Sequence, residues 1–296
     1  MPKGIIISNI SNIYNVENLE NNQIYRCSAR GKFKNEEVVP TVGDYVIINI
    51  LDDYKKEAVI ESIINRTNYV KRPKLANLTQ IILMLSMKMP KPDLLLLDKQ
   101  LAFAEMLGIK PIICINKTDL EEEQQILKIE EVYKQVGYTV IKTEAKNGIG
   151  VQQINDILKN NITAFSGNSG VGKSTLINQI FKKDITEEGT ISNKIKRGKN
   201  TTTIINLYKM DDNTYIADTP GFSTFDIFEI KKEDLDKYFI EFDKYLEKCE
   251  FIGCSHIKEQ NCGIKQAVCK EKINKDRYER YCKIYLELKE KEEHKW

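Results

Sequence analysis

A glycine-rich string, G-N-S-G-V-G-K-S at residues 167–174, constrains the fold of this chain more than any other stretch. It follows an apolar run at 162–165 and precedes a helix-like pattern at 175–181. In a strand–turn–helix context, G-x-x-x-x-G-K-S binds phosphate, because successive backbone N–H groups point at phosphate oxygens and the helix N-terminus adds favourable potential. The alternative is a glycine-rich turn without a ligand, which the flanking strand and helix argue against. The string therefore predicts a nucleotide-binding loop.

Two side chains of this loop have predicted roles in phosphate chemistry. Lys173 is expected to reach the β- and γ-phosphates, and the Ser174 hydroxyl is expected to hold Mg²⁺. The residues predicted to contact the nucleotide here are Gly167, Asn168, Ser169, Gly170, Val171, Gly172, Lys173, Ser174 and Thr175.

The chain of 296 residues is long enough for two or three domains. Up to about residue 70, short runs rich in Val, Ile and Tyr alternate with turns, which predicts a small barrel or sandwich. From about residue 78, strands alternate with helices, which predicts a parallel sheet. A helix at 233–247 and a charged helical tail from about 275 are expected after it. The predicted domains are 1–70, 71–230 and 231–296.

The basic and acidic residues almost balance, 45 against 43, so net charge says little about partners. One local cluster in the first domain is basic, with two interleaved aromatics, Tyr25 and Phe33. Such a mixture suits RNA, since aromatics stack on bases and cations meet phosphates, but a solvated hairpin is equally compatible. The basic residues of this cluster are Arg26, Arg30, Lys32 and Lys34.

Seven cysteines, four of them after residue 248, argue for a reducing compartment and against a disulfide framework. No apolar run approaches the length of a membrane span, and the first residues lack the apolar segment of a signal peptide. We therefore expect a cytoplasmic protein without a membrane partner.

A second motif, Asn116-Lys117-x-Asp119, follows an apolar strand at 111–115. The carboxylate of Asp119 can accept two hydrogen bonds from the N1–H and the exocyclic amine of guanine. Asn116 is expected to contact the other edge of the ring and brace the phosphate loop, and the Lys117 stem to pack across the base. The backbone N–H of Ala145 is the remaining predicted contact to guanine. The motif predicts GTP and GDP as the nucleotides.

A third motif, D-T-P-G at 218–221, provides metal and γ-phosphate contacts. Asp218 at a strand end is expected to orient Mg²⁺, and the Gly221 N–H to meet the γ-phosphate. The threonine run at 201–203 is expected to complete the metal site through Thr202, although a β-branched run is also good strand sequence. Lys173, Thr202, Asp218 and Gly221 are the predicted catalytic residues, and Ser174, Thr202 and Asp218 the predicted Mg²⁺ ligands.

The last motif is C-x₄-C-x-H-x₅-C, formed by Cys249, Cys254, His256 and Cys262. Three thiolates and one imidazole match a closed, tetrahedral structural zinc site, and buried thiols are the alternative. A four-ligand site leaves no open position for water, which excludes a zinc-dependent hydrolase. The other cysteines, Cys27, Cys114, Cys269 and Cys282, are interpreted as apolar fillers.

The order of the motifs is informative, because in ordinary GTPases the phosphate loop comes first and the guanine motif near the end. Here the guanine motif precedes the phosphate loop. A closed domain with neighbouring termini tolerates such rejoining, since the same sheet can form. The chain is thus predicted to contain a circularly permuted P-loop GTPase domain.

With these motifs, the junction N-Y-V-K-R-P at 68–73 and the cysteine cluster, nearly the whole chain resembles the bacterial RsgA (YjeQ) family of small ribosomal subunit biogenesis GTPases. The resemblance implies a multidomain α/β protein: an N-terminal OB-fold β-barrel that binds RNA, the permuted GTPase domain and a C-terminal α-helical zinc-binding domain. It also implies GTP hydrolysis in late maturation of the small (30S) subunit, with the subunit and its rRNA as partners of a monomer.

Three positions depart from the family pattern or from signalling GTPases. Glu144 stands where the family often has Ser, and Asn200 stands where it commonly has His. Phe222 follows D-T-P-G, as is typical of the family, whereas signalling GTPases have a water-orienting glutamine nearby. We therefore expect slow hydrolysis that needs a partner. The alternative hypothesis is an rRNA-binding scaffold that holds GTP without significant hydrolysis; the intact Lys173, Ser174 and Asp218 favour the enzyme.

Overall fold

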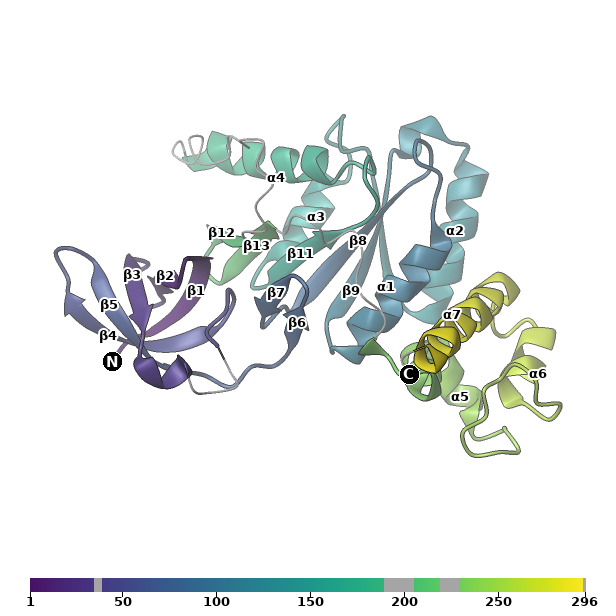
Figure 1. Cartoon of the computed structure of the whole chain (residues 1–296). Helices are drawn as coiled ribbons and strands as arrows, with labels where there is room; N and C mark the ends of the chain where they lie inside the picture. Colours follow the sequence, from purple (N-terminus) through teal and green to yellow (C-terminus); the bar gives the residue numbers. More distant parts are fainter. Residues whose placement is uncertain (35–38, 189–204, 219–228, 295–296) are drawn as a thin grey trace.

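The computed structural model of the chain describes residues 1–34, 39–188, 205–218 and 229–294 (Figure 1). Its N-terminal strands close into an OB-like barrel in the order β1-β2-β3-β5-β4, with β1 pairing back to β4. Side chains alternate between the barrel interior and solvent, as the fully buried Val46 and Ile48 of β4 illustrate. The strands are β1 (Lys3–Ile10), β2 (Ile13–Asn18), β3 (Ile24–Ala29), β4 (Tyr45–Asp52) and β5 (Glu57–Ile63).

The two aromatics of the basic hairpin do not face solvent. Tyr25 is 1% exposed and donates from its hydroxyl to Asp53 at 2.6 Å, and Phe33 is 6% exposed. Both rings therefore belong to the barrel core, and the prediction that they stack on RNA bases is wrong. Alternation along β3 explains the burial of Tyr25, because Tyr25 and Cys27 point inward while Arg26 points outward; Phe33 lies in the 3₁₀ helix Gly31–Lys34 that follows the strand.

The central sheet is parallel over the strand order β10-β9-β8-β11-β13, and β12 pairs antiparallel to β13 at one side. The inner strands β8, β9 and β11 are short, almost wholly buried apolar runs, as expected when helices cover both faces, whereas β10 at the sheet edge is only partly buried. The strands are β8 (Gln80–Ser86), β9 (Lys110–Asn116), β10 (Thr139–Thr143), β11 (Ile162–Ser166), β12 (Asn206–Asp211) and β13 (Thr214–Asp218).

Successive residues of β8 point to opposite faces of this sheet. Ile81 and Leu83 join the core beneath α1 and α2, whereas Ile82 and Met84 join the core beneath α3 and α4. The two layers of helices therefore sandwich the sheet (Figure 1). These helices are α1 (Leu94–Met106), α2 (Glu123–Val136), α3 (Val151–Leu158) and α4 (Lys173–Glu188).

The barrel and the central sheet are hydrogen-bonded to each other through β1 and β12, where Ser8 pairs with Asn206. Within the described residues, eleven strands thereby follow one another in a single continuous order. The buried carboxylate of Glu17 on β2 strengthens the junction, since it accepts from Lys209 Nζ at 2.7 Å and from the Tyr215 hydroxyl at 3.2 Å. A small hairpin of β6 (Tyr69–Lys71) and β7 (Lys74–Ala76) links barrel to sheet along the chain.

The C-terminal part is helical and lies against α1 (Figure 1). The single helix expected at 233–247 is wrong, because the chain there forms short 3₁₀ helices at Lys232–Tyr238 and Ile240–Phe242 before α5 (Asp243–Leu246). The tighter turns place Phe239 and Phe242 against the ring of Tyr281. The remaining helices are α6 (Gly263–Cys269) and α7 (Lys275–Glu293).

No helix in the described ranges is both long enough and apolar enough to cross a membrane.

Candidate functional site

The motif residues meet at one edge of the central sheet. Asn116 ends β9, Thr143 ends β10, Gly167 follows β11 and Asp218 ends β13, and these strands run parallel. The carboxyl ends of parallel strands lie at the same edge, which is the usual ligand-binding edge of open α/β sheets. The fold therefore gathers residues separated by about a hundred positions in the sequence.

The phosphate loop contains two glycines that pack closely against the rest of the site. Gly167 has φ +139°, and a Cβ there would lie 2.2 Å from the carbonyl oxygen of Met84. Gly172 has φ +104°, and a Cβ there would lie 2.2 Å from Asn116 Nδ2. Only glycine fits both the backbone conformation and the space at these positions. The loop is thus a backbone cradle of the kind that accommodates phosphate.

Lys173 bends back over this cradle. Its ammonium group donates to the carbonyl oxygens of Gly167 and, at 2.9 Å, of Asn168. Ser174 and Thr175 lie at the exposed start of α4, next to the loop. A cation and a helix N-terminus therefore converge on the loop, which makes it a favourable position for an anion.

Asn116 connects three loops of the site. It is 2% exposed, and its Nδ2 donates to the Val171 carbonyl of the phosphate loop at 2.8 Å. Its Oδ1 accepts from the Ala145 N–H at 3.0 Å and from the Thr143 hydroxyl at 2.9 Å. Asn116 therefore fixes the phosphate loop relative to the loops that are predicted to bind the base.

The other residues of the guanine motif lie beside Asn116. Lys117 has a left-handed backbone, φ +61°, and its ammonium donates to the Met89 carbonyl. Asp119 lies in an exposed turn at Thr118–Leu120. The Ala145 N–H, predicted to contact guanine, donates to Asn116 Oδ1, so Ala145 also supports the site through that side chain. Thr143 was missed by the sequence analysis, although its place at the end of β10 marks that edge.

Asp218 lies at the carboxyl end of β13, one strand from the phosphate loop. Its strand pairs with β11, where Ala217 lies opposite Ala164. The sheet thereby brings Asp218 to the same edge as Lys173 and Ser174. Thr202 and Gly221, the two other predicted catalytic residues, lie outside the described residues, as do Asn200 and Phe222.

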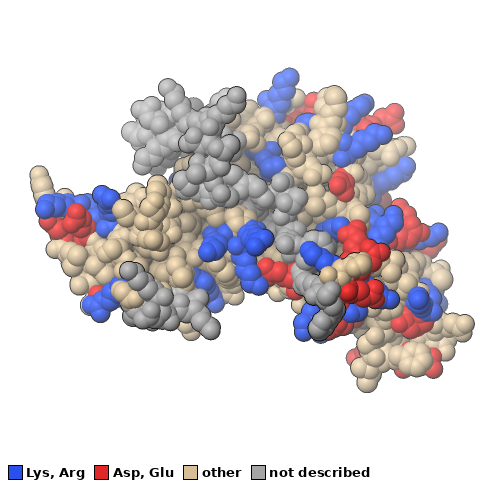
Figure 2. Space-filling view, in the orientation of Figure 1, with Lys and Arg blue, Asp and Glu red and all other residues tan. Residues whose placement is uncertain are grey.

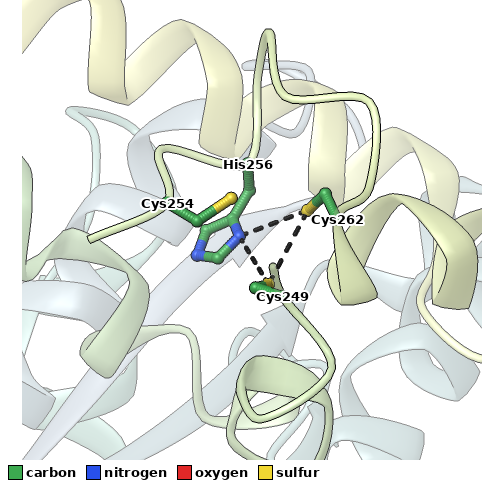
Figure 3. A group of neighbouring side chains, drawn as sticks. All are labelled: Cys249, Cys254, His256 and Cys262. Carbon is green, nitrogen blue, oxygen red and sulfur yellow. Dashed lines mark hydrogen bonds between the residues drawn. The ribbon is translucent and has the colours of Figure 1, made fainter. Parts of the chain in front are cut away.

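The four predicted zinc ligands converge in the C-terminal part (Figure 3). Cys249, Cys254, His256 and Cys262 each offer one ligand atom, and these atoms all lie within 4.8 Å of one another. The Cys249 and Cys262 sulfurs are 4.0 Å apart, and His256 Nδ1 lies 3.6 Å from the first and 3.3 Å from the second.

These distances fit a tetrahedral zinc ion. With Zn–S of about 2.3 Å and Zn–N of about 2.0 Å, tetrahedral angles place two sulfurs about 3.8 Å apart and a sulfur about 3.5 Å from the nitrogen. Burial, with the charge of Cys262 adding to it, raises the pKa of Cys254 to about 12. A divalent cation supplies the charge that lets buried thiols ionise together. The donor set and its geometry therefore suit structural zinc.

A carboxylate beside the cluster was missed by the sequence analysis. Asp236 Oδ2 lies 3.4 Å from His256 Nε2, the ring nitrogen that faces away from the sulfurs. Metal-bound histidines usually pair their second nitrogen in this way, which fixes the ring orientation. Phe242 packs edge-on against the same ring at 6.0 Å. Asp236 lies 13 residues before the first cysteine, and spacing alone could not single it out among the acidic residues there.

The surface of the molecule is not a single basic stripe. Figure 2 shows Lys and Arg beside Asp and Glu over much of one face. On the barrel, Arg30 forms a 2.8 Å ion pair with Glu61. Among the described residues of the barrel, Tyr54 in the turn between β4 and β5 is an exposed aromatic, with 96% of its surface exposed, and the sequence analysis did not select it.

Two family models match the chain. The RsgA N-terminal domain model matches residues 3–60, and the RsgA GTPase model matches residues 63–228.

Curated relatives are similar over almost their whole length. The chain is 39% identical over 290 residues to a protein of Ruminiclostridium cellulolyticum named small ribosomal subunit biogenesis GTPase RsgA, covering 98% of this chain and 95% of the relative. It is 42% identical to the Clostridium novyi protein of that name, covering 93% of each.

Two solved structures share the whole architecture. YjeQ from Thermotoga maritima superposes with a TM-score of 0.84 at 36% identity, covering 97% of this chain and 98% of that one. YloQ, described as a circularly permuted GTPase, gives 0.82 at 33% identity, covering 98% and 96%. Both the sequence matches and the permuted order of the motifs along this sheet lead to the same assignment: the chain belongs to the RsgA GTPase family.

Proposed function

We propose that this chain is a GTPase that binds the small ribosomal subunit and acts late in its maturation, hydrolysing GTP to GDP and phosphate. The single observation that supports it best is the Asn116 network, which joins a phosphate loop to a guanine motif in one rigid site. Relatives similar over almost the whole chain are named for this activity and this subunit. Hydrolysis is proposed to depend on stimulation by the subunit and its rRNA.

Binding of the nucleotide is divided between two groups of residues. Asp119 selects guanine, and Asn116, Lys117 and Ala145 complete the base site. The phosphate loop holds the α- and β-phosphates through its backbone, and the Lys173 ammonium moves from the loop carbonyls to the β- and γ-phosphates when GTP is bound. The loop residues are Gly167, Asn168, Ser169, Gly170, Val171, Gly172, Ser174 and Thr175.

Catalysis is proposed to rest on Lys173, Thr202, Asp218 and Gly221. Ser174, Thr202 and Asp218 would hold Mg²⁺, which neutralises charge on the β- and γ-phosphates when it is bound. The Gly221 N–H meets the γ-phosphate, and Lys173 stabilises the charge that develops during transfer to water. Phe222 has no polar group to orient that water, which is why a partner is needed.

The proposal also covers the metal ion, the domains, the oligomeric state and the location of the protein. One structural zinc ion is held by Cys249, Cys254, His256 and Cys262. The division into 1–70, 71–230 and 231–296 separates the RNA-binding, nucleotide-binding and zinc-binding parts. The protein is proposed to work as a monomer in the cytoplasm.

The test is GTP turnover by the purified chain with and without purified small subunits, with Lys173→Ala as the control for contaminating activity. We expect slow turnover by the chain alone and an acceleration of at least about tenfold with subunits. A tenfold acceleration corresponds to an activation barrier lowered by about 1.4 kcal/mol. A protein that binds GTP but turns it over at the Lys173→Ala rate in both conditions is a scaffold instead.

A further inference from the structure

Helix α1 lies between the phosphate loop and the C-terminal zinc-binding part. At its start, Asp93 caps the helix by accepting from the Leu96 N–H at 3.0 Å, and its other oxygen lies 3.5 Å from Asn168 Nδ2 of the phosphate loop. Leu96, Leu97 and Gln100 of α1 line a small cavity with Gly167 and Val171 of the loop. One flank of α1 therefore packs against the loop.

Gln100 makes the firmest contact on that flank. It is 2% exposed, and its Nε2 donates to Ser166 Oγ at 2.9 Å. Ser166 is fully buried and directly precedes Gly167, whose own position is fixed by the contact with Met84. The hydrogen bond thus ties α1 to the residue from which the phosphate loop starts.

The opposite flank of α1 is bound to α7. Asp98 is fully buried and accepts from Arg277 and Arg280 of α7, and from the Tyr133 hydroxyl at 2.8 Å. Lys99 adds an ion pair with Glu287, also on α7. Asp98 and Gln100 are two positions apart and so about 200° apart around the helix, which is why one faces α7 and the other faces the loop.

Helix α7 is in turn bonded to the zinc-binding loop. The Tyr278 hydroxyl donates to the His256 carbonyl at 2.7 Å, and the Tyr281 hydroxyl donates to the Ser255 carbonyl at 3.1 Å. A continuous set of contacts therefore runs from the metal ligands through α7 and α1 to the phosphate loop.

The centre of this set is a charge-balanced buried cluster. Arg277 is 1% exposed and binds Glu241 as well as Asp98, and its guanidinium lies 4.7 Å from the Phe239 ring centroid. Although burial lowers the pKa of Arg277, the charges of Asp98 and Glu241 outweigh it and raise that pKa well above its ordinary value. Loss of one partner while the others stay buried would leave a buried charge uncompensated, so the cluster ties α1 firmly to α7 only when all its pairs are made.

We propose that α1 couples the zinc-binding part to the phosphate loop, with Gln100 as the positioning residue of the loop and Asp98 as the residue through which α7 holds α1. The proposal rests on the proposed function, because it takes the loop to be the site of the nucleotide phosphates. Since coupling is reciprocal, a partner that pulls α7 away from α1 weakens nucleotide binding, and bound nucleotide favours the docked state.

The first test measures GDP affinity of the zinc-loaded full chain by titration. Gln100→Leu removes the donor to Ser166 and is expected to weaken GDP binding about five- to tenfold. Arg280→Leu removes one partner of Asp98, distant from the nucleotide, and is expected to weaken it about three- to tenfold; Arg280→Lys, which keeps the charge, is expected to restore most of the affinity. Lys283→Leu removes an exposed charge from the same helix and is the matched control.

The double variant Gln100→Leu with Arg280→Leu separates coupling from general destabilisation. If both act through α1, the double variant binds GDP about as tightly as Gln100→Leu alone. Additive losses, or unchanged GDP affinity in a folded, zinc-containing Arg280→Leu protein, overturn the proposal. If Arg280→Leu fails to fold, Lys99→Met takes its place, because it removes only the partly exposed ion pair with Glu287. Additive losses with Gln100→Leu, or unchanged GDP affinity in Lys99→Met, then overturn the proposal.

Amide hydrogen exchange of the nucleotide-free protein keeps this test distinct from the proposed function. Gln100→Leu and Arg280→Leu are each expected to speed exchange at 166–172, whereas Lys283→Leu leaves it unchanged. If the two variants show this faster exchange but the wild-type protein binds no guanine nucleotide, the proposed function is wrong and the coupling still stands. Unchanged exchange at 166–172 in both variants overturns the coupling itself.

Discussion

The amide of Asn116 uses its donor for the phosphate loop and its acceptor for the segment at the end of β10, where Thr143 and Ala145 both donate to it. Such an arrangement leaves no room for a side chain at Gly172, whose Cβ would meet the Asn116 nitrogen. At the scale of single residues, the site therefore depends on a glycine and an asparagine that have to be neighbours. Neither residue by itself indicates in the sequence that the two are in contact.

Gly172→Ala is expected to lower GDP affinity by about tenfold or more. The added methyl pushes Asn116 away from Val171, and the alanine is also strained at φ +104°. Nucleotide titration measures the effect. Gly148→Ala is the matched control, because Gly148 has φ +77° but meets no heavy atom within 4 Å. Equal losses in the two variants would show that backbone strain, and not the contact with Asn116, is responsible.

Asp119→Asn is expected to lower GTP affinity about a hundredfold, since two charge-assisted hydrogen bonds to guanine are replaced by weaker and partly mismatched ones. Xanthine nucleotides should stay comparatively well bound, because their ring carries an oxygen where guanine carries the amine. Competition binding with both nucleotides checks this, with Glu131→Gln on α2 as a control for loss of an exposed charge. If ATP competes as well as GTP with the unmodified protein, the guanine assignment fails.

At the scale of elements, the loop of the proposed zinc ligands, residues 249–262, owes its shape to contacts from several segments. Glu259 closes the loop, since it accepts from the Ser255 and Ile257 N–H groups at 2.9 and 3.1 Å, and these backbone bonds outweigh burial and lower the pKa of Glu259 to about 2. Asp236, Phe242 and Tyr281 contact or surround the His256 ring from outside the loop. The ligands are therefore only partly preorganised by their own segment.

Removal of zinc is expected to loosen residues 249–262 while the nucleotide site still binds GDP, with an affinity reduced by no more than about tenfold through α1. Ligand atoms from three separate turns converge only on folding, so metal affinity is part of the local folding free energy. Amide exchange after chelation, or in Cys254→Ala, measures the loosening, and Cys269→Ala at an exposed cysteine is the control. Freshly purified protein without zinc would contradict the assignment.

At the scale of the whole molecule, the barrel and the zinc-binding part are attached to opposite sides of the nucleotide-binding sheet (Figure 1). The barrel joins at β12, the strand that pairs with the Asp218-bearing β13, and the zinc-binding part joins at α1. Strand β12 is the neighbour of β13, which ends at the proposed Mg²⁺ ligand Asp218. Helix α1 lies next to the phosphate loop. A change at the nucleotide therefore has a short path both to the barrel and to the C-terminal part.

A non-hydrolysable GTP analogue is expected to tighten binding to the small subunit relative to GDP, because a γ-phosphate adds contacts that only one conformational state makes. Binding should also weaken as salt rises, through the barrel residues Arg26 and Arg30 and the basic stretch at 194–199. Co-sedimentation with subunits at several salt concentrations measures both effects. Equal affinity in the two nucleotide states would contradict a switch and favour the scaffold.

The sequence by itself determined the family, the sheet and the identity of the motifs. The phosphate loop, the guanine motif and the proposed zinc ligands each consist of chemically distinctive residues at short spacing, and the inner strands β8, β9 and β11 are short apolar runs. Their order along the chain was sufficient to predict the circular permutation, because the same sheet can form wherever the chain begins.

Only the tertiary structure decided which residues connect these motifs. The basic cluster around Tyr25 and Phe33 was compatible with base stacking or with a solvated hairpin, and both rings are core, because inward and outward positions depend on barrel closure and not on composition. The helix expected at 233–247 became 3₁₀ turns because Phe239 and Phe242 pack on Tyr281, a residue about forty positions later. Asp98 and Arg277 are ordinary surface-type residues in sequence, and a buried ion pair between them exists only once α1 and α7 meet.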